Sequence, residues 1–286
     1  NTRTPEHPNT RTPEHPNTMN PLEDVLDRIE RGLDSAKEVF ANYEPGEVAY
    51  RFKQGDDPIT EADDAVDAVL KRTLPREGEG WLSEETVDSA DRLTRSDVWI
   101  VDPLDGTREF VSGIPEWCVS IGFTRDGEAL AGGICNPVTG QTVVGARGLG
   151  VKYNGKSASA STIDALSGAR IMASRSEIKR GEWDRFEGED FQIVPCGSVA
   201  YKLGLVACGE CDATWTLVPK HEWDVAAGVA LVLAAGGSVF TIDGSPVVFN
   251  RPKPKLSGMI ATAPGLAGPI SEFLQIELKD VPIRQA

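Results

Sequence analysis

Residues Trp99–Thr107 read WIVDPLDGT, and this stretch holds the main evidence for both fold and function. The apolar run before Asp102 is typical of a buried β-strand, and the proline after it predicts a turn. Asp105 follows three residues later, so we expect both carboxylates to point to the same side of that turn. The backbone N–H groups of Gly106 and Thr107 can together bind a phosphate oxygen. An aspartate at a strand end is also a common turn former, so this stretch alone leaves its role open.

Three more acidic segments, TEAD, WLSEE and EWDVAAG, lie elsewhere in the chain. Taken singly, Asp63 is a first-turn helix acid, Glu84 is half of a solvated acidic pair, and Asp224 is a helix N-cap. Taken together, carboxylates from separate elements are ligands that Mg²⁺ prefers, and phosphate and water complete its shell. Two or more such ions can activate water and neutralise the leaving oxygen of a phosphate ester. The combination predicts a metal-dependent phosphatase.

Other catalytic motifs are missing from the sequence or fit it poorly. Phosphatases with a covalent aspartate use D-x-D-x-T, whereas two residues separate Asp102 from Asp105. The chain has no G-x-S-x-G, P-loop, H-E-x-x-H or EF-hand pattern. Cys208 and Cys211 have the spacing of half a zinc site, but no second pair accompanies them. Water is therefore the expected nucleophile.

The composition favours a globular protein that acts on small molecules. The chain has 286 residues, 40% of them hydrophobic, and no apolar run reaches the roughly 18 residues of a membrane span. Its net charge of −15 repels a nucleic-acid backbone, so we expect no nucleic-acid polymer and no membrane as a partner. Five cysteines without a signal peptide indicate a reducing compartment, and we expect a cytoplasmic location.

The chain divides into three predicted parts. Residues 1–18 repeat the polar octapeptide NTRTPEHP, so we expect a disordered, non-native leader. Residues 19–155 should form an α+β domain that carries the acidic motifs, with helices beginning near Pro21 and Thr60 and antiparallel hairpins after them. Residues 156–286 alternate strands and helices, which predicts a more parallel α/β domain that completes the site.

Strands and helices can be placed from apolar runs and turn residues. The predicted strands cover residues 98–101, 117–124, 130–134, 142–144, 171–173, 193–194, 213–217, 238–242 and 259–261. The predicted helices of the second half cover residues 199–208, 223–235 and 266–274.

The ordered segments Thr60–Asp63, Ser83–Glu85, Trp99–Thr107 and Glu222–Gly228 resemble the inositol monophosphatase superfamily, over about residues 20–265. The resemblance implies an α/β fold, the layered αβαβα sandwich of sugar phosphatases, and a lithium-sensitive homodimer. It also implies two or three Mg²⁺ ions as cofactor. The implied metal ligands are Glu84, Asp102, the carbonyl of Leu104, Asp105 and Asp224. The implied catalytic residues around the attacking water are Glu84, Thr107 and Asp63.

Within the superfamily, Ser83–Glu85 and Thr107–Phe110 are similar to the 3'(2'),5'-bisphosphate nucleotidase branch. The implied substrate contacts are Asp105, Gly106, Thr107, Arg108, Ser198, Lys202 and Asp224. Inositol-specific members tend to have an acid where Leu217 stands, but the arginine that the nucleotidase branch has nearby is missing too. We expect 3'-phosphoadenosine 5'-phosphate as substrate, with inositol monophosphate or another sugar phosphate as alternatives.

Two functions of other classes remain open. The chain could be a regulatory binding protein on the same scaffold, or a structural domain that stores Mg²⁺ or Ca²⁺. Metal-dependent release of phosphate separates both from a phosphatase.

Overall fold

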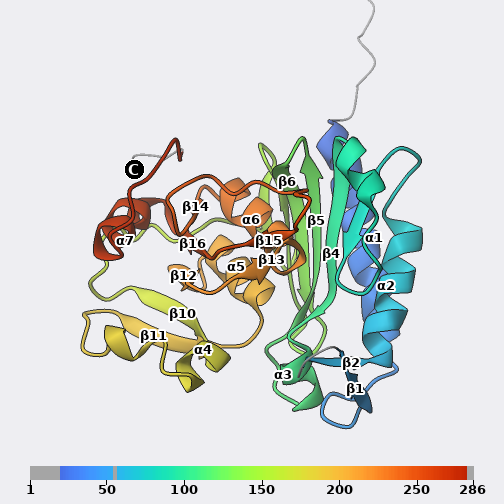
Figure 1. Cartoon of the computed structure of the whole chain (residues 1–286), viewed down its shortest axis with the longest axis horizontal. Helices are drawn as coiled ribbons and strands as arrows, with labels where there is room; N and C mark the ends of the chain where they lie inside the picture. The colour runs from blue at the N-terminus through green and yellow to red at the C-terminus, as the bar shows by residue number, and fades with distance from the viewer. Residues whose placement is uncertain (1–19, 54–56, 282–286) are drawn as a thin grey trace, which may run out of the picture.

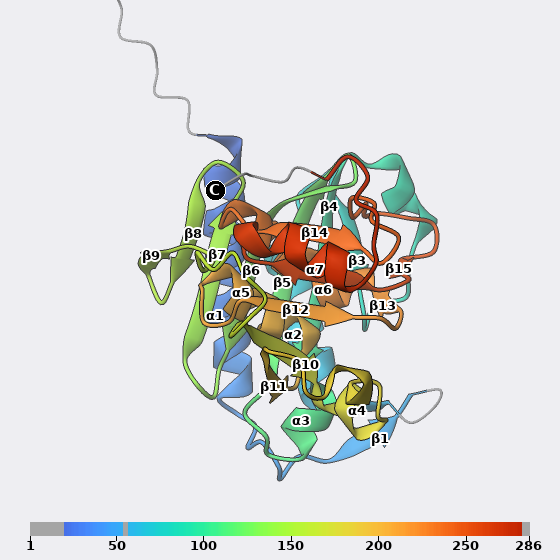
Figure 2. The ribbon, with the colours of Figure 1, turned by 90° about the vertical axis from the view of Figure 1, so that its left-hand side faces the viewer.

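The computed structural model describes residues 20–53 and 57–281, which form five layers (Figure 1). These are a helix pair, a seven-stranded sheet, a second helix pair, a five-stranded sheet and an outer layer with short helices; α7 stands in front in Figure 2. The predicted αβαβα sandwich is confirmed. The predicted disordered leader, residues 1–18, lies outside the described residues.

The first helix pair consists of α1 (Pro21–Phe40) and α2 (Glu61–Thr73). Each helix begins with a capping box, in which an N-cap side chain and an acid three residues later satisfy the free N–H groups. The capping pairs are Asn20 with Glu23 and Thr60 with Asp63. Both predicted helix starts are therefore confirmed.

The seven-stranded sheet has the order β3-β4-β5-β6-β7-β8-β9. Its strands are β3 (Gly80–Ser83), β4 (Asp97–Asp105), β5 (Cys118–Arg125), β6 (Glu128–Asn136), β7 (Gln141–Ala146), β8 (Gly150–Tyr153) and β9 (Lys156–Ala158). β3 and β4 are parallel, and each later pair of neighbours is antiparallel, which confirms the predicted hairpins. The first half also contains β1 (Tyr50–Phe52), β2 (Pro58–Thr60), η1 (Ala90–Thr94) and α3 (Thr107–Val111).

The turn predicted after Asp102 is wrong, because β4 continues to Asp105. Its register with β5 shifts between these two aspartates, so an irregularity inside the strand replaces the turn. Proline is tolerated at position 103 because neither neighbouring strand pairs with it: β3 ends opposite Val101.

The middle layer consists of α5 (Val199–Ala207) and α6 (Glu222–Ala234). Glycines of the first sheet let α6 approach closely. A Cβ atom on Gly132 would lie 2.3 Å from the carbonyl oxygen of Ala227, and one on Gly122 would lie 2.8 Å from the Ala226 Cβ. The position of α6 on the sheet is therefore tightly fixed.

The five-stranded sheet has the order β11-β10-β12-β16-β14. Its strands are β10 (Arg170–Ser174), β11 (Gln192–Cys196), β12 (Ala213–Thr216), β14 (Ser238–Thr241) and β16 (Met259–Thr262). β16 runs antiparallel to both of its neighbours, and the other four strands run in one direction. The predicted parallel arrangement therefore holds for those four strands. The exception arises because no crossover helix connects β14 to β16.

Among the remaining elements, η2 (Asp184–Phe186), η3 (Pro264–Leu266) and α7 (Ala267–Phe273) pack against apolar side chains of this sheet. α4 (Arg175–Lys179) contacts β10 and β11, and β13 (Lys220–His221) pairs with β15 (Lys255–Leu256) and contacts α6. Apolar side chains of α7 pack with Trp215 and Phe240 in a core of their own.

The division into domains at residues 155 and 156 stays a prediction. β9 pairs with β8 and so extends the first sheet just past this point. α5 and α6 contact both sheets. Among the described residues, no helix combines the length and the apolar character that crossing a membrane requires.

Candidate metal and phosphate site

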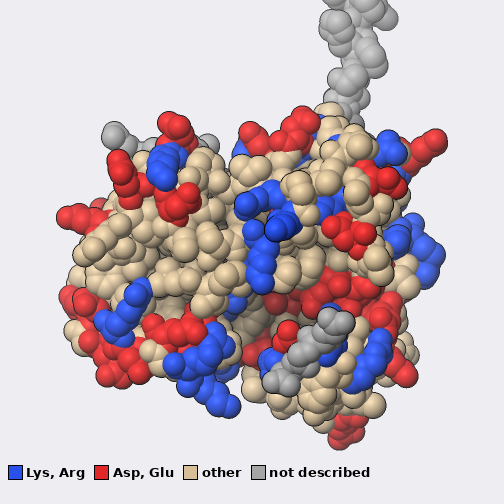
Figure 3. Space-filling model, in the orientation of Figure 1, with Lys and Arg blue, Asp and Glu red and all other residues tan. Residues whose placement is uncertain are grey.

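The four acids predicted to bind metal ions line one cavity of about 490 Å³ between the two sheets, whereas Asp63 does not line it. Its wall contains the side chains of Glu84, Asp102, Asp105 and Asp224, together with Leu104. In Figure 3, acidic side chains gather beside the indented middle of the face, and basic side chains lie above them. The predicted metal-ligand set is thus brought together from β4, α6 and the segment after β3.

Asp102 and Asp105 belong to the irregular end of β4. Asp102 is only 1% exposed, and its Oδ1 accepts a hydrogen bond of 3.0 Å from the N–H of Leu104. The Oδ2 of Asp105 accepts hydrogen bonds from the Ser198 hydroxyl and the Ala200 N–H, both at 2.6 Å. The start of α5 therefore fixes the orientation of the Asp105 carboxylate, which belongs to the seven-stranded sheet.

Asp224 lies in the first turn of α6, where its Oδ2 accepts the N–H of His221 at 2.9 Å. The N-cap is His221, so Asp224 is the acid of the capping box and not the N-cap. The positive end of the helix favours a carboxylate there.

Each of the four acids keeps one oxygen without a hydrogen bond to a described residue: Glu84 Oε2, Asp102 Oδ2, Asp105 Oδ1 and Asp224 Oδ1. Burial raises the pKa of Asp102, and the charges of Glu84, Asp105 and Asp224 raise it further. Burial and the nearby carboxylates likewise raise the pKa of Asp224. Oxygen donors that repel one another in a buried wall fit a hard divalent cation.

No three Asp, Glu, His or Cys side chains of the described ranges are already arranged to hold one metal ion. This arrangement is compatible with Mg²⁺, which is commonly bound by one or two carboxylates, with waters and substrate phosphate as the other ligands. The donor set therefore fits the predicted cofactor.

Lys53 is a site residue that the sequence analysis missed. Its ammonium lies 2.8 Å from Glu84 Oε1 and 2.6 Å from Glu85 Oε1, and it lines the cavity. Burial raises the pKa of Glu84 and Glu85, that of Glu85 to about 7, while Lys53 opposes the rise. No local pattern marks Lys53, because it lies 31 residues before Glu84.

Asp63 and Thr107 are in contact, as a shared role requires. The Thr107 hydroxyl lies 3.2 Å from Asp63 Oδ1 and 3.1 Å from the Leu104 carbonyl oxygen. Asp63 is 1% exposed, and its Oδ2 accepts the N–H and the hydroxyl of Thr60. A hydroxyl has one proton, and a charged carboxylate is its stronger acceptor.

Gly106 places the chain in the conformation that begins α3. Its φ is +100°, and a Cβ atom there would lie 3.0 Å from the Trp117 Cβ. Both conditions require glycine. Gly106 and Thr107 line the cavity, as a phosphate-binding role requires.

The predicted substrate contacts Arg108, Ser198 and Lys202 also line the cavity. Arg108 is exposed and forms an ion pair of 2.9 Å with Asp57. Lys202 is buried, and its ammonium donates to the carbonyl oxygen of Ser198 at 2.8 Å. These contacts leave the substrate-binding roles as predictions.

A layered sandwich whose strand and helix ends carry carboxylates around one cleft is the arrangement of a phosphatase of the sugar-phosphatase type, in which the site and not the fold carries the function. The model of the inositol monophosphatase family matches residues 23–272. The chain belongs to the inositol monophosphatase family, whose members hydrolyse phosphoric monoesters and depend on metal ions, typically Mg²⁺.

Individual relatives carry two kinds of name. Inositol monophosphatase 2 of Solanum lycopersicum is 34% identical over 204 residues, 66% of this chain and 76% of that protein. The 3'(2'),5'-bisphosphate nucleotidase CysQ of Aggregatibacter actinomycetemcomitans is 30% identical over 241 residues, 80% of this chain and 87% of that protein. The structure of inositol monophosphatase from Anabaena (Nostoc) sp. PCC 7120 superposes with a TM-score of 0.74 at 26% identity, over 92% of this chain and 98% of that one.

Proposed function

We propose that this chain is a Mg²⁺-dependent phosphomonoesterase that hydrolyses 3'-phosphoadenosine 5'-phosphate to AMP and phosphate. The observation that carries the proposal is the wall of four carboxylates facing a cavity of about 490 Å³. A volume of this size accommodates a nucleotide. The similarity to the nucleotidase CysQ, which extends over 80% of this chain, supports the nucleotide branch.

Glu84, Asp102, Asp105, Asp224 and the carbonyl of Leu104 would hold the metal ions. Bound there, Mg²⁺ supplies positive charge to the phosphoryl oxygens and makes a water molecule easier to deprotonate. The N–H groups of Gly106 and Thr107 bind a phosphate oxygen and fix the orientation of the phosphoryl group.

Thr107 and Glu84 bracket the attacking water. Because the Thr107 hydroxyl donates its hydrogen bond to Asp63, its lone pairs remain free to accept a hydrogen bond from that water. As the water oxygen bonds to phosphorus, one water proton passes to the Thr107 hydroxyl, whose own proton moves to Asp63. The ester P–O bond breaks, and the leaving oxygen takes a proton from solvent. No covalent bond to the enzyme forms.

The second candidate is hydrolysis of inositol 1-phosphate to inositol and phosphate. It is favoured by the relatives named inositol monophosphatase, among them those of Solanum lycopersicum and Mesorhizobium japonicum.

Phosphate release from the two substrates, measured side by side with Mg²⁺ and with or without lithium, tests the proposal. We expect Mg²⁺-dependent, lithium-sensitive release with higher kcat/KM for the nucleotide. A preference for inositol 1-phosphate would select the second candidate, and the absence of release from both would refute a phosphatase of either kind.

We further propose that the enzyme is a cytoplasmic homodimer. All five cysteines are free, and four of them are buried, as suits a reducing compartment. Light scattering coupled to size-exclusion chromatography tests the dimer, which a mass near the 30.8 kDa of one chain would refute.

A further inference from the structure

Lys220 lines the cavity from the second half of the chain, although no sequence motif marks it. It belongs to the two-residue strand β13, which pairs with β15, so its backbone is held in the cavity wall. Its side chain is 17% exposed. An ammonium group is therefore placed where substrate binds, largely shielded from bulk water.

The ammonium of Lys220 is weakly engaged. It forms an ion pair of 3.6 Å with Glu177 Oε1, and none of its three N–H donors makes a hydrogen bond to a described residue. A shielded ammonium without hydrogen-bond acceptors favours an anionic ligand.

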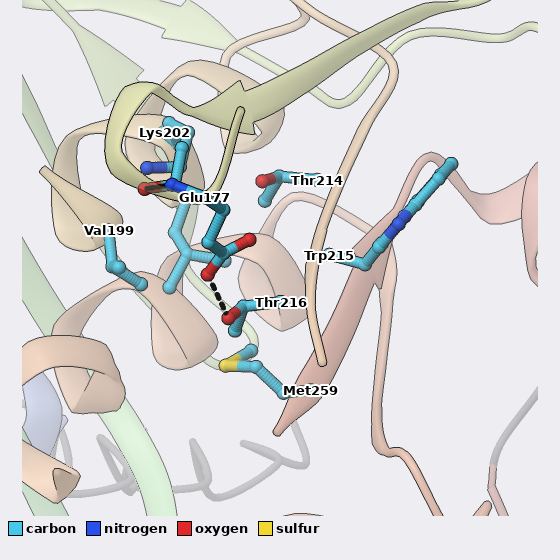
Figure 4. Close-up of a pocket in the computed structure, with 9 residues that line it drawn as sticks. Glu177, Val199, Lys202, Thr214, Trp215, Thr216 and Met259 are labelled. Atoms are coloured by element: carbon cyan, nitrogen blue, oxygen red, sulfur yellow. Dashed lines mark hydrogen bonds between the residues drawn. The ribbon is translucent and has the colours of Figure 1, made fainter. Parts of the chain in front are cut away.

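Glu177 does not satisfy Lys220, because other donors already hold its carboxylate. Oε1 accepts the Thr216 hydroxyl at 2.6 Å, drawn as the dashed line in Figure 4, and Oε2 accepts the Trp183 indole N–H at 3.2 Å. Glu177 is 2% exposed, so these bonds fix it firmly. Its charge attracts the Lys220 ammonium to this wall at 3.6 Å without occupying its hydrogen-bond donors.

A second ammonium reinforces the positive charge here. Lys202 lies beside Glu177 around a small adjoining cavity of about 10 Å³ and also lines the main cavity (Figure 4). Burial lowers the pKa of Lys202, and the charge of Lys220 in the same cavity wall lowers it further. Ser174 and Ser176 add hydroxyl donors to the same cavity. Backbone carbonyl oxygens of Cys196, Gly197 and Ser198 already accept the Lys202 donors, and the two serine hydroxyls bond to each other at 2.9 Å. Lys202 therefore adds positive charge, and Lys220 supplies the open donors that a phosphate group accepts.

We propose that Lys220 is a specificity-determining residue that binds a second anionic group of the substrate. The inference rests on the proposed function, because it takes the scissile phosphate to lie against the carboxylate wall. Lys220 is also within electrostatic range of Asp224, so the two anionic groups of one small molecule can reach both places. The substrate class is a phosphate monoester with a second phosphate, and an inositol monophosphate lacks that group.

The test compares Lys220→Gln and Lys220→Arg with the wild type. The measured quantity is the ratio of kcat/KM for 3'-phosphoadenosine 5'-phosphate to kcat/KM for inositol 1-phosphate. We expect Lys220→Gln to lower this ratio about 10–100-fold, through a higher KM for the nucleotide, because a charge-assisted hydrogen bond is lost. Lys220→Arg keeps the charge and should restore most of the ratio.

Lys253→Gln is the matched control. It removes the same charge from an exposed position between β14 and β15 that does not line the cavity, so the ratio should stay within about twofold of wild type. Equal changes for both substrates in Lys220→Gln, or none, would overturn the inference and leave the proposed function standing.

A calorimetric titration of the full chain with 3'-phosphoadenosine 5'-phosphate in EDTA tests Lys220 without turnover. Lys220→Gln should weaken this binding about tenfold or more, and Lys253→Gln should not. If the wild type released no phosphate from either substrate, the proposed function would fail and this titration alone would decide on Lys220. Equal affinities of wild type and Lys220→Gln would overturn the inference.

Discussion

The Oδ2 atom of Asp105, in the first sheet, lies 2.6 Å from the hydroxyl of Ser198 at the start of α5. Ser198 adopts a left-handed backbone with φ of 49°, which is uncommon for a residue other than glycine. A conformation of this kind persists where the surrounding structure fixes it, and here it lets one serine cap α5 and orient a carboxylate of the site.

Replacing Ser198 by alanine should weaken the site without removing it. Asp105 would keep the Ala200 N–H but lose its hydroxyl donor. We expect kcat/KM to fall about 10–100-fold, with a higher Mg²⁺ concentration for half-maximal activity. A Mg²⁺ titration of phosphate release checks this, and an unchanged half-maximal concentration would show that Asp105 does not depend on Ser198.

Replacing Asp105 by asparagine should abolish nearly all turnover, by roughly 10³-fold or more, while the fold survives. Asparagine keeps the shape and an oxygen acceptor, but removes the negative charge that a metal ligand needs. Asp97→Asn is the control, because Asp97 lies at the other end of β4 and pairs with Arg125. Substantial activity in Asp105→Asn, with a normal circular dichroism spectrum, would contradict the site assignment.

Thr107→Val and Thr107→Ser separate the hydroxyl from the shape of the side chain. Valine removes the group that joins Asp63 to the attacking water, and we expect kcat to fall about 10²–10⁴-fold. Serine keeps the hydroxyl and should retain most of kcat. Steady-state kinetics at saturating Mg²⁺ measures both values of kcat, and equal losses in the two variants would show that the hydroxyl alone does not account for the role of Thr107.

Glu79→Gln tests a buried ion pair remote from the site. Burial alone would raise the pKa of Glu79, but hydrogen bonds from Arg28, Trp99 and the Arg76 N–H hold it below 4.5. Arg28 is 4% exposed, and the variant leaves its charge only the longer ion pair of 3.4 Å with Asp24, so the free energy of unfolding at neutral pH should fall by about 2 kcal/mol.

The pH dependence of this loss has a definite sign. The ionised Glu79 stabilises the fold above the pKa of the unfolded chain, and this stabilisation disappears as pH falls through the lower pKa of the folded state. The two proteins should therefore approach equal stability in urea unfolding below pH 4.5. A difference in the free energy of unfolding that stays constant down to pH 3 would contradict the ionic explanation. Glu128→Gln, which breaks an exposed ion pair with Arg147, is the control and should change stability little.

Features encoded by neighbouring residues could be predicted from the sequence. The capping boxes at Asn20 and Thr60 are local, and both helix starts are confirmed. The four acids predicted as metal ligands lie at one cavity, because their motifs place each beside a strand or helix end; their roles stay predictions. The prediction of a turn after Asp102 was wrong. A proline usually indicates a turn, and the sequence does not show that β3 ends before it could pair with Pro103.

Features that depend on distant parts of the chain could not be predicted. The direction of β16 follows from how the chain returns after β14, which apolar runs do not encode. Lys53 and Lys220 resemble any surface lysine in sequence, and only the assembled cavity gives them acidic neighbours.

The contact of Gly132 with Ala227 has a consequence for folding. Asp102 and Asp224 are more than a hundred positions apart in the chain, and they meet only after α6 has settled on the first sheet. Partly folded chains should therefore lack the complete set of ligands, so that metal binding is a late event and draws its energy from the finished fold. Any Mg²⁺ that the native state binds and the unfolded chain does not will raise the melting temperature with concentration, and cellular magnesium then helps to maintain the folded population.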